Sequence, residues 1–479
     1  MILAVVIASS AFLVHTHTGF ERNDFLSSDE AAFLRNSMRF DLDLTNLRVE
    51  GENYHPFFGF LVQNIVLRIT GTDYILMWTQ NYVLFAVVAF LMMRLSLLLT
   101  GRYFAALPAI ILLILDPTFI REFFIGLRVI YHTNIILSLI TLILMLNFIQ
   151  ERRISTLSLF IGVSTLNILT IETGQFLYAI SLLTIAFFTT DKESWRQPFN
   201  RFKRYIGEHG KTQRDWLIRA LSINAAVMTI LAISRLYMGQ NIFQPGDTPT
   251  RLLIALLTII IVSIILNTFS KGETRYKTST YSLLSASIIQ ISVLITISLF
   301  SDFPERALTY LIPIVFITAM SALYNTISNL IKKNKVLKGT SLTTAFLIIL
   351  IGSVYLQAPQ LSEEVDSIRE EKMHLQDFSE MVGLLTEDKD HLSYSLAFRS
   401  YNTKDDLLLE DSSLIETDKL SIRDSYTYKI VNLHGMTEFK MILAKDIEDR
   451  FWDRIDVGLE CEKTNETEYH KLLDCIVIQ

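Results

Sequence analysis

The chain of 479 residues is 51% hydrophobic and only 19% charged, with a mean hydropathy of +0.36. That composition excludes an ordinary soluble enzyme. The net charge of −6 is unevenly divided, because residues 358–479 hold 28 of the 49 acidic residues but only 14 of the 43 lysines and arginines. This tail therefore carries −14 and the rest of the chain +8. A basic apolar part followed by an acidic tail argues against nucleic acid as the main partner.

Apolar runs in the first 357 residues have the length of membrane-spanning helices. Crossing a bilayer takes about 20 apolar residues, and residues 251–269 and 341–357 are clear examples. The sequence predicts about eleven transmembrane helices, near residues 1–14, 75–98, 104–116, 130–149, 155–171, 174–189, 216–237, 251–269, 280–300, 307–330 and 340–357. Pro108 and Pro313 fall inside two of them and are expected to kink them.

Basic residues gather in alternate connections between these helices. They lie around residues 102, 152–153, 192–214, 271–277 and 332–338. The positive-inside rule then places these connections and the N-terminus in the cytoplasm. The loops 15–73, 117–129, 239–250 and 301–306 and the tail face the other side of the cell membrane, as parts of a multi-pass protein.

The acidic tail, residues 358–479, reads as a small extracytoplasmic α+β domain. Residues 362–385 favour a helix, whereas 426–431 and 439–443 alternate as strands do. Cys461 and Cys475 both lie near its end, and their spacing alone does not decide whether they pair. The predicted fold class is thus an all-α polytopic membrane bundle, residues 1–357, followed by this domain.

The outer segment 15–73 holds the residues best suited to chemistry, since long polar loops on a rigid scaffold tend to be functional. Asp29 and Glu30 precede an apolar-periodic stretch, where they could also simply cap a surface helix. His55 stands before Pro56, either as a ligand-binding side chain or as a turn residue. A divalent cation held by Asp29, Glu30 and His55 is an alternative, because carboxylate and imidazole suit such ions. No other cofactor is indicated.

These motifs occur in an order that resembles the GT-C superfamily of membrane glycosyltransferases, in particular the branch of protein O-mannosyltransferases and lipid A aminoarabinose transferases. The chain supplies Asp29-Glu30-Ala31-Ala32-Phe33, then His55-Pro56-Phe57-Phe58, then a third helix that ends at Asp116-Pro117. An outer segment from Arg121 to Tyr131 leads into the fourth helix. The resemblance covers about the first 190 residues in order, and the later helices match in number and topology.

The resemblance implies that a sugar is transferred from a polyprenyl-phosphate donor to a hydroxyl of a glycan, lipid or protein on the non-cytoplasmic face. Asp29 matches the catalytic aspartate of the family and is the candidate base, and Glu30 would assist it. Candidate binding residues for the sugar or the phosphate are His55, Arg121, Arg128, Glu172, Arg235 and Arg251.

Arg121 and Arg128 rank first among the arginines, and a helix would place both on one face. Each arginine could instead be a helix-end residue that reaches toward the membrane surface. Glu172 departs from the family, which often has a basic residue there, and a carboxylate cannot bind phosphate directly.

Two other classes of function remain open at this stage. One is a non-catalytic multi-pass protein that binds a lipid or a partner through its outer tail, which Glu172 favours. The other is a secondary transporter, which is disfavoured because most charges lie at helix ends rather than at the membrane midplane.

Overall fold

The structure is a computed structural model of the whole chain. It describes residues 1–18, 33–34, 36–38, 40, 42–43, 48–49, 56–71, 74–126, 128–171, 173–189, 259–261, 263, 274–298, 309–333, 351, 355, 359, 361–362, 365–366, 373, 377, 394–397, 438–445 and 458–478. Two compact units form: one is built from residues 1–14, 40–69 and 77–361, the other from residues 15–39, 70–76 and 362–479.

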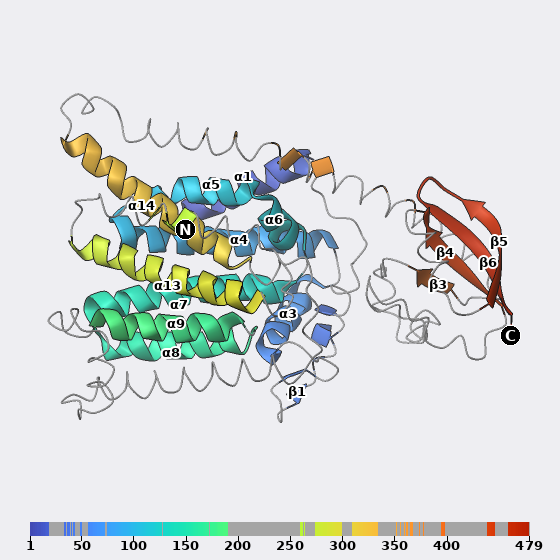
Figure 1. Cartoon of the computed structure of the whole chain (residues 1–479), viewed down its shortest axis with the longest axis horizontal. Helices are drawn as coiled ribbons and strands as arrows, with labels where there is room; N and C mark the ends of the chain where they lie inside the picture. The colour runs from blue at the N-terminus through green and yellow to red at the C-terminus, as the bar shows by residue number, and fades with distance from the viewer. Residues whose placement is uncertain are drawn as a thin grey trace. The chain divides into compact units, whose positions relative to one another are not determined.

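The first unit is a bundle of apolar helices (Figure 1). In chain order they are α1 (Ile2–Thr18), α3 (Phe57–Thr70), α4 (Tyr74–Thr100), the 3-10 turn η1 (Tyr103–Ala106), α5 (Leu107–Leu115), α6 (Pro117–Phe119), the π-helix η2 (Ile120–Ile125), α7 (Val129–Glu151), α8 (Ile154–Ile168), α9 (Thr173–Thr189), α13 (Thr274–Ser298) and α14 (Leu311–Lys333). A short ribbon pairs β1 (Leu42–Asp43) with β2 (Arg48–Val49).

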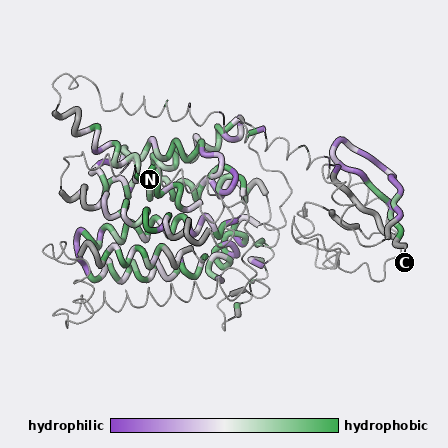
Figure 2. The backbone as a smooth tube through the Cα atoms, viewed as in Figure 1, coloured by the Kyte–Doolittle hydropathy of each residue, from purple (hydrophilic) through white to green (hydrophobic). Residues whose placement is uncertain are grey.

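Three helices in the described part of the chain are long and apolar enough to cross a membrane: Leu76–Thr100, Val129–Glu151 and Leu311–Ser328. A fourth span is formed if Tyr103–Leu115 and Pro117–Ile125, which meet at 69°, count as one broken helix. Hydrophobic residues run along the bundle helices and hydrophilic ones gather at their ends (Figure 2). The chain is therefore a membrane protein, as predicted, and its count of about eleven spans stays a prediction.

Helix α7 lies at the centre of the described bundle, since α8, α9 and α13 all pack against it. Large side chains are buried in this packing, such as Phe148 of α7 and Phe160 of α8. Some polar side chains between these helices are hydrogen-bonded to one another, because lipid offers them no partner. Asn167 donates to Ser138 Oγ over 3.1 Å, and Gln150 donates to Ser279 Oγ over 2.7 Å.

The predicted helices at 75–98, 104–116, 130–149, 155–171, 174–189, 280–300 and 307–330 are present with ends shifted by a few residues. Those at 216–237 and, apart from isolated residues, at 251–269 and 340–357 lie outside the described residues. The expected proline kinks are wrong. Pro108 and Pro313 lie in the first turns of α5 and α14, where proline removes no helical hydrogen bond.

The second unit contains a four-stranded sheet in the order β3-β4-β6-β5. Its strands are β3 (Tyr394–Ala397), β4 (Glu438–Ala444), β5 (Gly458–Glu466) and β6 (His470–Ile478), and only β3 and β4 pair in parallel. Strand β5 is mostly hydrophilic and β6 mostly hydrophobic (Figure 2). The strand predicted at 439–443 is confirmed within β4, whereas 426–431 lies outside the described residues.

A disulfide joins Cys461 and Cys475, which the sequence had left open. The two residues face each other across the antiparallel pair β5–β6. The bond therefore links neighbouring strands at the end of the chain.

Candidate functional site

Three segments singled out in the sequence meet at one end of the bundle. The backbone N–H of Phe58 donates to the carbonyl of Leu169 over 2.8 Å, so the start of α3 lies against the end of α8. A Cβ on Gly59 would come within 1.9 Å of Ile130 Cγ1, so α3 also touches the first turn of α7. The motif around Pro56 is thus adjacent to the chain just before Glu172 and just after Arg128.

Helix α3 itself was not predicted, because residues 15–73 were taken as a hydrophilic loop. Its sequence, FFGFLVQNIVLRIT, buries Phe60, Gln63 and Leu67 on one side, and its 14 residues are too few to span a bilayer upright. Helices α3 and α6 lie at the same end of the bundle (Figure 1). The sequence signal for this helix was the short apolar run that begins directly after Pro56, since proline is common at the start of a helix.

The segment between α5 and α7 is a built structure rather than a plain loop. Asp116 ends α5 and caps the next turn, as its Oδ1 accepts the N–H of Phe119 over 2.8 Å with Pro117 at the first helical position. The chain then continues as the π-helix Ile120–Ile125. Such π-turns are uncommon and often occur at functional sites.

An aromatic cluster supports the buried side of this π-helix. Phe85 of α4 contacts Phe119, Phe123 and Phe124, with ring centroids 4.8 to 6.2 Å apart. Phe123 also packs on the fully buried His132 of α7, with centroids 4.3 Å apart. Because aromatic rings bury large areas, this packing fixes where the polar residues of the π-helix lie.

Arg128 is the N-cap residue of α7 and forms an ion pair with Glu122. Its Nη1 lies 3.3 Å from Glu122 Oε2, and the two side chains are only 12% and 19% exposed. Arg121 lies in the π-helix. The expectation that one helical face carries both arginines is wrong, because the helix ends at Ile125 and α7 begins only at Val129.

Sequence reasoning missed Glu122 and Asn81, the two side chains that organise this segment. The amide of Asn81 donates to the carbonyls of Phe124 and Gly126 over 3.0 and 2.9 Å. Asn81 is fully buried in α4, 43 residues before Phe124, so no local pattern marks its role. Glu122 stands in the outer segment from Arg121 to Tyr131, REFFIGLRVIY, where an acidic residue between two arginines was the signal.

Asp29, Glu30, His55, Glu172, Arg235 and Arg251 lie outside the described residues, and their roles stay predictions. The same holds for the divalent cation. Within the described part of the chain, no group of three histidine, cysteine, aspartate or glutamate residues could hold a metal ion.

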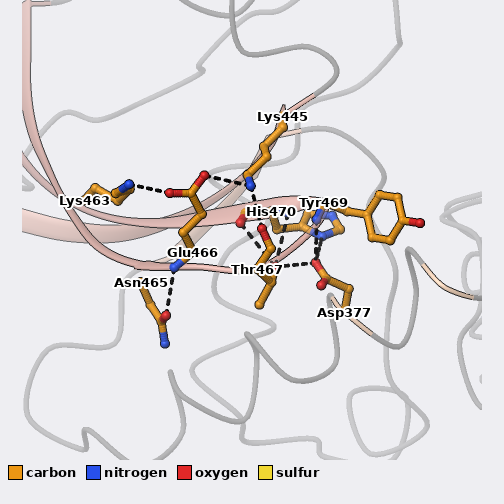
Figure 3. A network of polar contacts seen from close by, with 8 residues as sticks. All are labelled: Asp377, Lys445, Lys463, Asn465, Glu466, Thr467, Tyr469 and His470. Atoms are coloured by element: carbon orange, nitrogen blue, oxygen red, sulfur yellow. Dashed lines mark hydrogen bonds and ion pairs between the residues drawn. The ribbon is translucent and has the colours of Figure 1, made fainter.

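A second polar network lies in the sheet domain (Figure 3). Asp377 Oδ2 is 2.8 Å from His470 Nδ1 and accepts the hydroxyl of Thr467 and, over 3.3 Å, the N–H of Tyr469. The hydroxyl donates to the carboxylate and not to the imidazole, so this is not the nucleophile–base arrangement of a hydrolase. The network holds Asp377 to the β5–β6 turn.

Polar and charged groups beside this turn lower the pKa values of Asp377 and Glu466. Burial raises the pKa of Asp377, but the hydrogen bonds from Thr467 and His470, the charge of His470 and the N–H of Tyr469 outweigh it and leave the pKa below its usual 3.8. Hydrogen bonds from Lys445 and Lys463 lower the pKa of Glu466 to about 2. Both carboxyl groups are therefore ionised at neutral pH.

Comparison with known proteins shows a likeness to solved structures. No family model matches the chain, and no curated protein matches its sequence. A crystal structure of ArnT from Cupriavidus metallidurans bound to undecaprenyl phosphate is similar with a TM-score of 0.50 and 10% identity, over 99% of this chain and 97% of that chain. The apo structure of the same protein gives a TM-score of 0.45 at 10% identity, over 94% and 93%.

The likeness to the lipid-bound structure extends over nearly all of both chains, so it concerns the whole fold. ArnT is an aminoarabinose transferase of the GT-C family. The resemblance predicted from the order of the sequence motifs is confirmed for the fold, because the chain shares the architecture of the lipid-bound ArnT structure.

Proposed function

We propose that this chain is a membrane glycosyltransferase that takes its sugar from a polyprenyl-phosphate carrier. The observation that carries the proposal is the shared fold over nearly the full length of ArnT, whose structure holds undecaprenyl phosphate. The convergence of the Pro56, Arg128 and Leu169 segments at one end of the bundle supports it. A fold alone does not assign an activity, so the chemistry must come from the residues.

In the proposed reaction, a hydroxyl of the acceptor attacks the anomeric carbon of the sugar. Its proton passes to the Asp29 carboxylate, and the bond from the sugar to the lipid phosphate breaks, with the electron pair leaving on the phosphate. Glu30 orients Asp29. Arg128, with Arg121 close by in sequence, supplies positive charge for the departing phosphate, because guanidinium groups bind phosphate through paired N–H donors.

The proposed site faces the non-cytoplasmic side, together with the tail. The disulfide between Cys461 and Cys475 supports this placement, because such bonds persist in oxidising compartments. The alternation of basic connections supports it independently. The acceptor would then be a glycan, lipid or protein exposed on that face.

The test is Asp29→Asn, in cells where loss of the gene changes a surface glycan. The amide keeps the shape of the carboxylate but cannot take a proton, so we expect transfer to fall by about 10² to 10⁴. Asp24→Asn, in the same segment, is the matched control and should keep activity. Undiminished transfer by Asp29→Asn protein present at wild-type amounts would reject Asp29 as the base.

The competing function is a non-catalytic membrane protein that binds a lipid or a partner through its acidic tail. The carboxylate of Glu172, at a position where the family that the sequence resembles often has a basic residue, favours it, as does the tail charge of −14 among residues 358–479. A thermal shift of the purified protein with undecaprenyl phosphate separates the two. Absence of stabilisation at saturating lipid rejects the transferase and supports the competitor, whereas stabilisation leaves only a competitor that itself binds this lipid, which the Asp29→Asn test then separates from the transferase.

A further inference from the structure

The ion pair between Arg128 and Glu122 is nearly enclosed. The Nη1–Oε2 distance is 3.3 Å, and the side chains are 12% and 19% exposed, whereas the pair Arg153–Glu151 at 3.2 Å is 72% and 40% exposed. A cation held away from water needs a nearby anion, because leaving it uncompensated is costly. Glu122 supplies that anion inside the protein.

The backbone of the π-helix imposes this pairing. The N–H of Gly126 donates to the carbonyl of Arg121 over 3.0 Å, which closes the last π-turn. A Cβ on Gly126 would lie 2.8 Å from the carbonyl oxygen of Glu122, so only glycine lets the chain fold back this tightly. Asn81 binds the carbonyls of Phe124 and Gly126 and holds the turn from the neighbouring helix α4.

The contact itself is modest for a guanidinium and a carboxylate. The Nη1–Oε2 distance of 3.3 Å is longer than the 2.7 to 2.9 Å of strong charge-assisted bonds. A phosphate can engage a guanidinium through two oxygens, which is geometrically stronger. The pair is therefore suited to being exchanged for a phosphate.

We propose that Glu122 is a resident counter-anion of Arg128, which the phosphate group of the lipid donor displaces when it binds. The inference rests on the proposed function and extends it by assigning a role to Glu122. The ion pair must then break before the lipid phosphate can bind Arg128. Glu122 therefore lowers the affinity for the lipid and stabilises the site when no lipid is bound. Any anion that is too weak to replace the carboxylate is excluded by the same competition.

The experiment compares undecaprenyl phosphate binding by full-length wild-type, Glu122→Gln and Arg128→Gln proteins in detergent, with Glu151→Gln as the matched control. Removing the competing charge should tighten binding of Glu122→Gln by about tenfold, equivalent to about 1.4 kcal/mol. Arg128→Gln should weaken binding by at least about as much. Glu151→Gln should match the wild type, because its ion pair is exposed and lies at the cytoplasmic connection predicted from the sequence.

Glu122→Asp gives the same test with a smaller change, since the shorter side chain draws the charge back from Arg128. It should also tighten binding, by less than Glu122→Gln does. Equal or weaker binding by both Glu122 variants, with the wild type binding normally, overturns the role of Glu122 alone. If the wild type does not bind undecaprenyl phosphate, the proposed function fails and this inference fails with it.

Discussion

Asp377 illustrates how one carboxylate can organise a turn that is distant in sequence. It lies 93 residues from His470 and bonds the hydroxyl of Thr467, the N–H of Tyr469 and the imidazole of His470. Its Oδ2 takes part in all three contacts, so its replacement leaves three groups of the β5–β6 turn without their acceptor. Removing the shared partner of buried groups costs more than removing an ordinary surface bond.

We expect Asp377→Ala, which removes the shared acceptor, to loosen the β5–β6 turn by about 1 to 3 kcal/mol. Hydrogen exchange of peptides that cover residues 466–471, measured on the full chain, should become faster by the corresponding factor. Glu468→Ala is the matched control, because Glu468 is an exposed carboxylate in the same turn. Unchanged exchange in the Asp377 variant would show that the turn holds without the network.

The same turn should lose protection in acid. The folded-state pKa of Asp377 lies below 3.8, and that of Glu466 is about 2 against an ordinary 4.5. A depressed acid pKa stabilises the folded state above the ordinary pKa, and the effect is lost as the pH falls through the folded value. Exchange at the turn, corrected for its intrinsic pH dependence, should therefore stay slow down to about pH 4.5 and rise between there and pH 2. A rise already complete at pH 5 would contradict this assignment.

At the scale of whole elements, glycine sets the spacing between α8 and α9. A Cβ on Gly174 would lie 2.5 Å from the carbonyl oxygen of Asn167, which is backbone and cannot move aside. Gly162, within α8, has nothing within 4 Å of such a Cβ. The two glycines thus differ in packing although both belong to this helix pair.

We expect Gly174→Ala to destabilise the bundle by about 1 to 3 kcal/mol, because it forces the helices apart. Gly162→Ala is the control and should be neutral or stabilising by about 1 kcal/mol, since alanine favours a helix. The denaturation midpoints of the purified proteins measure both changes. Equal midpoints for the two variants would show that the α8–α9 contact tolerates a wider spacing.

Long helices were predictable from the sequence, whereas the elements at the candidate site were not. Apolar length alone locates α4 and α7, since any chain that crosses lipid must pair its backbone within the helix. Helix α3 and the π-helix at 120–125 are short and partly polar, so no length criterion identifies them. The role of Asn81 depends on a contact across 43 residues, which local patterns do not contain.

The candidate site was predictable only in part, for a related reason. The resemblance of motif order selected the segment with Arg121 and Arg128, but a helical spacing rule misplaced their common face. Gly126 and the break before Val129 end the helix between them. The sequence also does not show which charge neutralises Arg128, because that depends on tertiary geometry. The structure identifies Glu122, which forms an ion pair with it.

For the molecule as a whole, labelling of its two cysteines tests on which side of the membrane the tail lies. Cys461 and Cys475 form a disulfide across β5 and β6, and the basic connections predict that this domain is not cytoplasmic. In intact cells the pair should therefore be oxidised. A maleimide reagent that does not cross membranes should label the tail only after a reductant is added.

The control introduces Glu151→Cys into a protein that carries Cys461→Ser and Cys475→Ser. Residue 151 ends α7 beside Arg152 and Arg153, in a connection predicted to be cytoplasmic, and it is exposed. The introduced thiol should react only after the membrane is permeabilised and should need no reductant. The predicted topology would be inverted if the tail cysteines needed permeabilisation but no reductant and the introduced thiol were labelled in intact cells. The proposed transfer reaction would then lie on the cytoplasmic face.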